Sequence, residues 1–248
     1  MPIYQIVLLV ILGFVPSIVW LNFYYREDCH PEPKHLLTKV FLMGIILSPL
    51  AILFQIILVK CGSLAALQKL CLPIGFLQPA GPEFLLWSSF VEEVVKLYAV
   101  RFVILHDPAF DEPIDAMIYM ITAGLGFAAI ENVLVVFQTT PDGFSVTMNT
   151  LILRFIGATL LHALASGLLG YFLAISWFFQ HHHKKLLITG LILATLFHFT
   201  FNMFIFSFEG QIYALIYTTA LLLGIAFLIS VLFDRLKYRH TSVPTPSI

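Results

Sequence analysis

The chain has few charged residues for its length. Asp, Glu, Lys and Arg make up 11% of its 248 residues, and hydrophobic residues make up 60%, whereas charged residues account for about 25% of an ordinary soluble domain. The mean hydropathy is +0.95. So few polar side chains cannot cover a surface exposed to water, which excludes a soluble globular protein. We therefore predict an integral membrane protein surrounded by the lipid bilayer, and the formal net charge of −1 gives no indication of a nucleic-acid partner.

Several motifs are absent from the sequence. The three cysteines, Cys29, Cys61 and Cys71, form no CxxC pair, so neither a thiolate metal site nor a redox dithiol is indicated. There is no HExxH sequence, which excludes the helix motif of soluble zinc proteases. No internal repeat is visible, so the sequence does not support a transporter built from inverted repeats.

Long apolar runs are abundant, and a membrane-spanning helix needs about 20 mostly apolar residues. By this criterion we predict an all-α fold, a polytopic transmembrane helical bundle of about seven spanning helices. The segments are 3–23, 37–59, 84–105, 115–137, 150–178, 186–208 and 211–233. We expect one transmembrane catalytic domain over residues 1–240 and a disordered cytoplasmic tail at 241–248. The stretch 64–78 is apolar but short, and it is either a loop or a re-entrant helix.

The basic residues predict the orientation of the bundle. Most of them fall in loops that share one side if the N-terminus is outside: Arg26, Lys34, Lys39, Lys184, Lys185, Arg235, Lys237 and Arg239. Cytoplasmic loops carry the excess of Lys and Arg. The N-terminus is therefore predicted to lie outside the cell and the C-terminus in the cytoplasm.

Ionisable residues interrupt four of the apolar segments. Glu92 and Glu93 lie in the middle of 84–105, and Glu131, His162 and His198 lie in three further segments. A carboxylate at the bilayer centre costs a few kcal/mol, so such residues are functional candidates. Counted from the outer helix ends, the four positions lie roughly 9–18 Å deep at 1.5 Å per residue. Similar depths in four helices predict a single polar site inside the bundle.

The spacing of the charged residues in 84–105 separates the two glutamates. Glu92 and Lys96 are four residues apart and share a helix face, so Lys96 is expected to neutralise a carboxylate and support the site. Glu93 points about 100° away from Glu92. One glutamate is thus expected to face the reaction centre while the other ties its helix to a neighbour, and the spacing leaves open which does which.

Two chemical schemes fit these residues, and both give peptide hydrolysis. In the first, Glu131, His162 and His198 hold a zinc ion with a position open for water, and Glu92 or Glu93 takes the proton of that water. In the second, a glutamate and a histidine activate water without a metal. In the metal-free scheme, His198 and Asn202, which share a helix face, donate hydrogen bonds to the oxyanion.

Four short motifs occur in order, each within its own apolar segment. They are Glu92-Glu93-Val-Val-Lys96, Phe127-Ala-Ala-Ile-Glu131-Asn132, His162-Ala-Leu-Ala-Ser166 and His198-Phe-Thr-Phe-Asn202. Together they resemble the PrsW family of intramembrane proteases, with its EExxK, FxxxEN and HxxxN motifs, within the larger group of CAAX prenyl proteases and bacteriocin-processing enzymes. The resemblance covers residues 84–208, the motif-bearing core.

The resemblance implies a multi-pass protease of the bacterial cell (inner) membrane that cleaves membrane-associated protein or peptide substrates. One role in the family is cutting an anti-sigma factor on its extracytoplasmic side. Asn132 is expected to support the site by packing. Two other functions remain open from the residues alone. Buried Glu and His also relay protons in a proton-coupled transporter, and a non-catalytic membrane scaffold would retain the same motifs.

Overall fold

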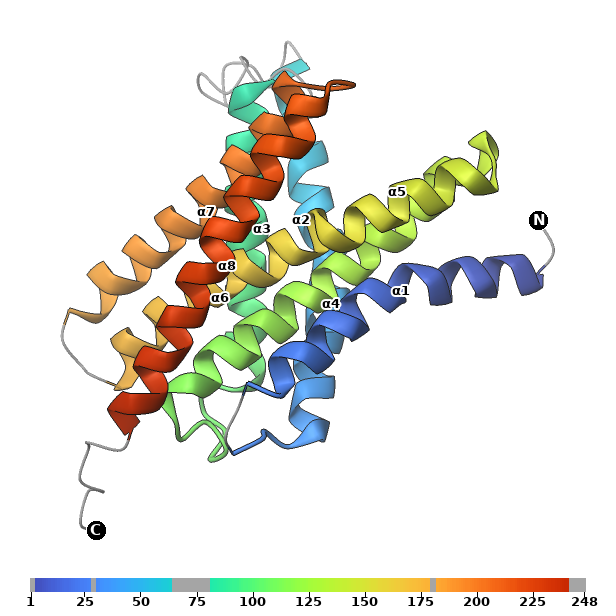
Figure 1. Ribbon diagram of the computed structural model, residues 1–248. Helices are drawn as coiled ribbons and strands as arrows, with labels where there is room; N and C mark the ends of the chain where they lie inside the picture. The colour runs from blue at the N-terminus through green and yellow to red at the C-terminus, as the bar shows by residue number, and fades with distance from the viewer. Residues whose placement is uncertain (1–2, 28–29, 64–80, 179–181, 241–248) are drawn as a thin grey trace, which may run out of the picture.

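The computed structural model describes residues 3–27, 30–63, 81–178 and 182–240, and within these ranges the regular elements are helices, with no strand (Figure 1). The elements are α1 (Ile3–Tyr25), α2 (Lys34–Ser63), α3 (Pro82–Val103), α4 (Pro113–Thr139), the 3₁₀ turn η2 (Thr140–Asp142), α5 (Phe144–Ile156), α6 (Ala158–Phe178), α7 (His183–Ser207) and α8 (Ile212–His240). The predicted all-α helical bundle is confirmed. The segments 64–78 and 241–248, for which we predicted a loop or re-entrant helix and a disordered tail, lie outside the described residues.

The core of the bundle is built around α4. Its residues from Pro113 to Ala129 are all buried, and α4 contacts α1, α2, α3, α5, α6 and α8. Glycines permit this crowding, because a Cβ at Gly126 would collide with the Phe41 carbonyl of α2 and one at Gly124 with Ser166 of α6. Close backbone approach through small residues is how helices pack in membranes.

Six stretches of the described chain are long and apolar enough to cross a membrane: Ile3–Tyr25, Lys34–Ile57, Pro113–Asp142, Phe144–Phe178, His183–Ser207 and Ile212–Lys237. Their outward faces expose large apolar side chains such as Ile192 and Phe227, as lipid-facing helices do. The protein is therefore a multi-pass membrane protein. The helix α3, which covers most of the predicted segment 84–105, is not one of these six stretches; its 22 residues span about 33 Å at 1.5 Å per residue and it packs against α2, α4, α6 and α7.

The predicted segment 150–178 is not one helix. The chain from Phe144 to Phe178 forms α5 and α6, which are separated at Gly157. The backbone there has φ −91° and ψ −93°, and a Cβ at this position would lie 2.8 Å from the Leu153 carbonyl oxygen. A straight helix over these 35 residues would measure about 52 Å, well beyond the hydrocarbon thickness of about 30 Å.

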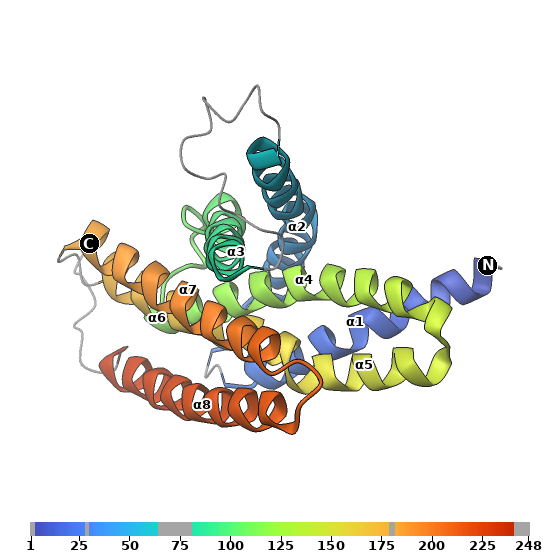
Figure 2. The ribbon, with the colours of Figure 1, turned by 90° about the horizontal axis from the view of Figure 1, so that it is seen from above.

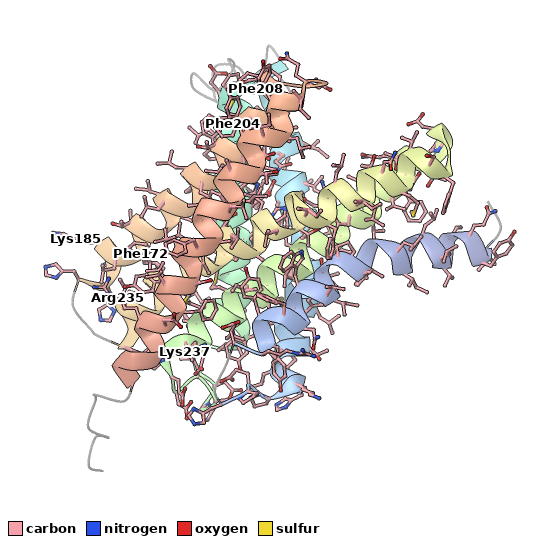
Figure 3. All side chains as sticks on the ribbon, in the orientation of Figure 1. Phe172, Lys185, Phe204, Phe208, Arg235 and Lys237 are labelled. Carbon is pink, nitrogen blue, oxygen red and sulfur yellow. The ribbon has the colours of Figure 1, made fainter. Side chains whose placement is uncertain are left out.

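The views from two directions show how the helices surround α4. Seen from above, α6, α7 and α8 lie to one side and α1 and α5 to the other, while α3 is viewed nearly along its axis beside α2 (Figure 2). Lys185, Arg235 and Lys237 lie at the end of the bundle opposite Phe204 and Phe208 (Figure 3). The basic residues of α7 and α8 thus gather at one end, which is the end that the sequence predicts to face the cytoplasm.

Candidate active site

The polar residues of the motif-bearing core meet in the middle of the bundle. Glu92, Glu93 and Lys96 come from α3, Glu131 from α4, His162 from α6 and His198 from α7. The side chains of Glu93 and Lys96 have no exposed surface, and both histidines are buried. The structure therefore brings the predicted residues of four separate helices into one site.

Glu93 and Lys96 orient His198. Lys96 Nζ donates to Glu93 Oε1 at 2.7 Å, and His198 Nδ1 lies 2.8 Å from the same oxygen. Because a carboxylate accepts hydrogen bonds, Nδ1 of His198 carries a proton, and in the neutral form of the ring Nε2 keeps its lone pair. A carboxylate that fixes a histidine in this way is typical of metal and hydrolytic sites.

Lys96 pairs with Glu93, three residues away, although the four-residue spacing places Glu92 on the same helix face as Lys96. The reason is a tertiary contact, since Lys96 Nζ also lies 2.7 Å from Nδ1 of His162 on α6. A charged ammonium donates to that nitrogen, so Nε2 of His162 carries the proton. It donates to Glu131 Oε2 at 2.9 Å. The two imidazole rings meet edge to face with their centroids 5.0 Å apart.

Glu92 has one satisfied and one free carboxylate oxygen. Gln55 of α2 donates from Nε2 to Glu92 Oε1 at 3.1 Å. Oε2 has no hydrogen-bond partner among the residues described, and it lies 3.6 Å from His198 Nε2. When the His198 ring is neutral, two hydrogen-bond acceptors face each other. A group with two donors, such as water, or a cation would relieve their repulsion.

Glu92, His162 and His198 form a group that can hold a metal ion. Ligand atoms of Glu92, His162 and His198 all lie within 4.8 Å of one another, and two imidazoles with a carboxylate form a donor set of catalytic zinc sites. Glu92 takes the carboxylate place that we predicted for Glu131, which instead contacts His162. In the structure both ring nitrogens of His162 are hydrogen-bonded. Ligation by His162 would therefore require release of Lys96 or Glu131.

A second set of contacts surrounds Glu131 and Asn132. Arg154 of α5 donates to Glu131 Oε2 at 3.0 Å and to Asn132 Oδ1 at 2.7 Å. Asn132 in turn donates to Thr159 Oγ1 of α6 at 2.9 Å. Asn132 thus joins α4 to α5 and α6.

Asn202 lies one helical turn from His198 on α7. Its amide donates to Ser89 Oγ of α3 over 3.4 Å, a long bond by the usual standard. The amide thus joins α7 to α3 close to the site, and it is held weakly enough to take another acceptor.

Sequence reasoning did not single out Gln55 or Arg154. Each is an isolated polar side chain within an apolar segment, 37–59 and 150–178 respectively. The rule that identified Glu92, the cost of a polar group in lipid, applies to both. That signal was therefore present in the sequence.

Comparison with known proteins gives a family for the chain. The model of the "PrsW family intramembrane metalloprotease" matches residues 32–232. "Protease PrsW" of Oceanobacillus iheyensis is 27% identical over 208 residues, which cover 80% of this chain and 83% of that protein. The Bacillus subtilis protein of that name is 25% identical over 205 residues, covering 81% and 84% respectively.

A shorter match is with "Protease PrsW" of Geobacillus kaustophilus, which is 28% identical over 165 residues. These residues cover 66% of this chain and 64% of that protein. No solved structure matches the chain.

Proposed function

The chain belongs to the PrsW family of intramembrane proteases, and we propose that it hydrolyses peptide bonds of membrane-associated protein substrates at the centre formed by Glu92, His162 and His198. One observation carries this proposal. Glu92 Oε2 and His198 Nε2 lie 3.6 Å apart in the buried centre, an arrangement that suits a water molecule donating to both when the ring is neutral. Water held by a carboxylate and an imidazole is the nucleophile that peptide hydrolysis requires.

The protein's own groups divide the chemical work. As the oxygen of the water attacks the scissile carbonyl, Glu92 accepts a proton from the water. Glu92 then donates that proton to the leaving amine. Glu93 and Lys96 hold His198 so that Nε2 stays directed at the water. Asn202 exchanges its long bond to Ser89 for one to the oxyanion that forms on the carbonyl.

We further propose that zinc assists this reaction, with Glu92, His162 and His198 as its ligands. The free oxygen of Glu92 and the free nitrogen of His198 support this donor set. A zinc ion held there would supply a Lewis acid for the scissile carbonyl. Glu92 would then be occupied, and the proton-accepting role would pass to Glu131, whose side chain is 25% exposed beside His162.

The proposed location is the bacterial cell membrane, with the N-terminus outside and the C-terminus in the cytoplasm. The gathering of basic residues at one end of α7 and α8 supports this orientation. Cleavage is then expected in the part of the substrate nearer the extracytoplasmic side. An anti-sigma factor anchored in the membrane would be a substrate of this kind.

A matched pair of glutamate variants on α3 tests the proposal. The protein is reconstituted into liposomes with a panel of fluorescence-quenched synthetic peptides that each contain one transmembrane segment. Glu92→Gln is expected to lower kcat at least 100-fold, because general acid–base catalysis contributes about 10²–10⁴-fold. Glu83→Gln, an exposed position on the same helix, is expected to keep wild-type activity.

Two outcomes would contradict the proposal. Proton-dependent flux in the same liposomes without cleavage of any peptide would identify a transporter. A Glu92→Gln variant that cleaves at the wild-type rate would remove Glu92 from the reaction, because another group would then activate the water.

A further inference from the structure

Arg154 occupies the last turn of α5, just before the break at Gly157, and its guanidinium reaches two adjacent residues of α4. Nη2 donates to Glu131 Oε2 at 3.0 Å and Nε donates to Asn132 Oδ1 at 2.7 Å. Two parallel donors on a planar group match two neighbouring acceptors, a geometry that lysine cannot reproduce.

These two bonds connect Arg154 to the catalytic histidine. Glu131 Oε2 receives one hydrogen bond from Arg154 and another from His162 Nε2. Asn132 is held from its other side by Thr159, so α4, α5 and α6 are joined at this point. The position of the Glu131 carboxylate, and through it the orientation of the His162 ring, therefore depends on Arg154.

The exposure of the site residues shows where Arg154 lies relative to the buried centre. The side chains of Glu93 and Lys96 are fully buried, and those of His162 and His198 are 2% and 3% exposed. The side chains of Arg154 and Glu131 are 19% and 25% exposed. The pair thus forms the more exposed margin of the site.

We propose that Arg154 is a positioning residue for peptide hydrolysis, which holds Glu131 and Asn132 with its guanidinium and so fixes His162 in the catalytic orientation. This inference rests on the proposed function of the site. A positive charge alone does not meet the requirement, because both acceptors must be bonded at once. Misplacement of a catalytic group by about 1 Å costs on the order of 100-fold in rate.

The test uses Arg154→Lys and Arg154→Ala in liposomes with a quenched transmembrane peptide that the wild-type protein cleaves. We expect kcat to fall at least tenfold in Arg154→Lys and about 100-fold in Arg154→Ala, with KM within twofold of wild type. Millimolar ethylguanidinium should restore part of kcat in Arg154→Ala, whereas ethylammonium at the same concentration should not. Arg235→Lys, an exposed arginine of α8, serves as the matched control and should match the wild type.

The outcomes separate the inference from the function on which it rests. A wild-type protein that cleaves no peptide overturns both. If the wild type cleaves and Glu92→Gln does not, wild-type kcat in Arg154→Lys overturns the inference alone. The inference is also overturned if both Arg154 variants lose activity only in proportion to their loss of folded protein, measured by thermal unfolding, and if ethylguanidinium does not restore that activity. The arginine would then serve only the fold.

Discussion

Lys96 is the residue whose removal tests the buried charge network most directly. Its side chain has no exposed surface, and its ammonium lies 2.7 Å from Glu93 Oε1 and 2.7 Å from His162 Nδ1. Removing one partner of a buried ion pair costs about 3–5 kcal/mol, because the other charge stays buried without compensation. We predict that Lys96→Met, which keeps most of the side-chain volume, lowers the free energy of unfolding by about 3–5 kcal/mol.

The double variant Lys96→Met with Glu93→Gln supplies the decisive comparison. It removes both charges together, and replacing a whole buried pair by neutral groups is often close to neutral for stability. We expect the double variant to recover at least about 2 kcal/mol of the loss caused by Lys96→Met alone, even though His198 then loses its charged partner.

The measurement is reversible unfolding in mixed micelles of nonionic detergent and SDS, followed by tryptophan fluorescence. Lys185→Met, an exposed lysine of α7, is the control and should change the free energy of unfolding by no more than about 0.5 kcal/mol. A double variant no more stable than Lys96→Met would refute the reasoning, since the energetic coupling of the two side chains would then be absent.

Two further predictions concern the carboxylate of Glu92. Elemental analysis of the detergent-purified protein should find about one zinc per chain. This zinc should be lost in His162→Ala and in His198→Ala. A wild-type protein that contains no metal and still cleaves peptide would instead favour activation of water by Glu92 and His198 alone. Gln55→Leu removes the amide donor to Glu92 Oε1 and should lower kcat at least tenfold with little change in KM, because a hydrogen bond to a charged group contributes about 1.5–3 kcal/mol. Wild-type kcat in Gln55→Leu, measured from initial cleavage rates, would mean that Glu92 keeps its orientation without α2.

Much of the fold follows from elementary constraints that the sequence exposes. Lipid requires every backbone group to be satisfied within the segment, so long apolar runs must be helices. The cost of burying charge then marks Glu92, Glu93, Glu131, His162 and His198 as exceptional. The break between α5 and α6 was not predictable from hydropathy, because apolar residues continue across Gly157.

The partners within the site were not predictable from spacing. Positions three and four residues apart are both neighbours on a helix, so the sequence left Lys96 free to meet Glu93 or Glu92. The contact with His162 on α6 selects Glu93, and this contact exists only once α3 and α6 pack. The partners of Gln55 and Arg154 lie 37 and 22–23 positions away in the sequence. These contacts also exist only once the helices pack.

The two adjacent glutamates differ in how their burial is compensated, and this difference separates their roles. Neither Glu92 Oε2 nor Glu93 Oε2 has a hydrogen-bond partner among the described residues, yet Glu93 is matched by the ammonium of Lys96 and by His198 Nδ1 on its other oxygen. Glu92 accepts a hydrogen bond from the neutral amide of Gln55, and its other oxygen lies 3.6 Å from His198 Nε2, beyond hydrogen-bond distance. A buried carboxylate compensated so poorly destabilises the fold relative to an apolar side chain of similar volume. Stability therefore gives no reason for a carboxylate at position 92, whereas a carboxylate with a free oxygen beside a fixed imidazole is what activation of water requires.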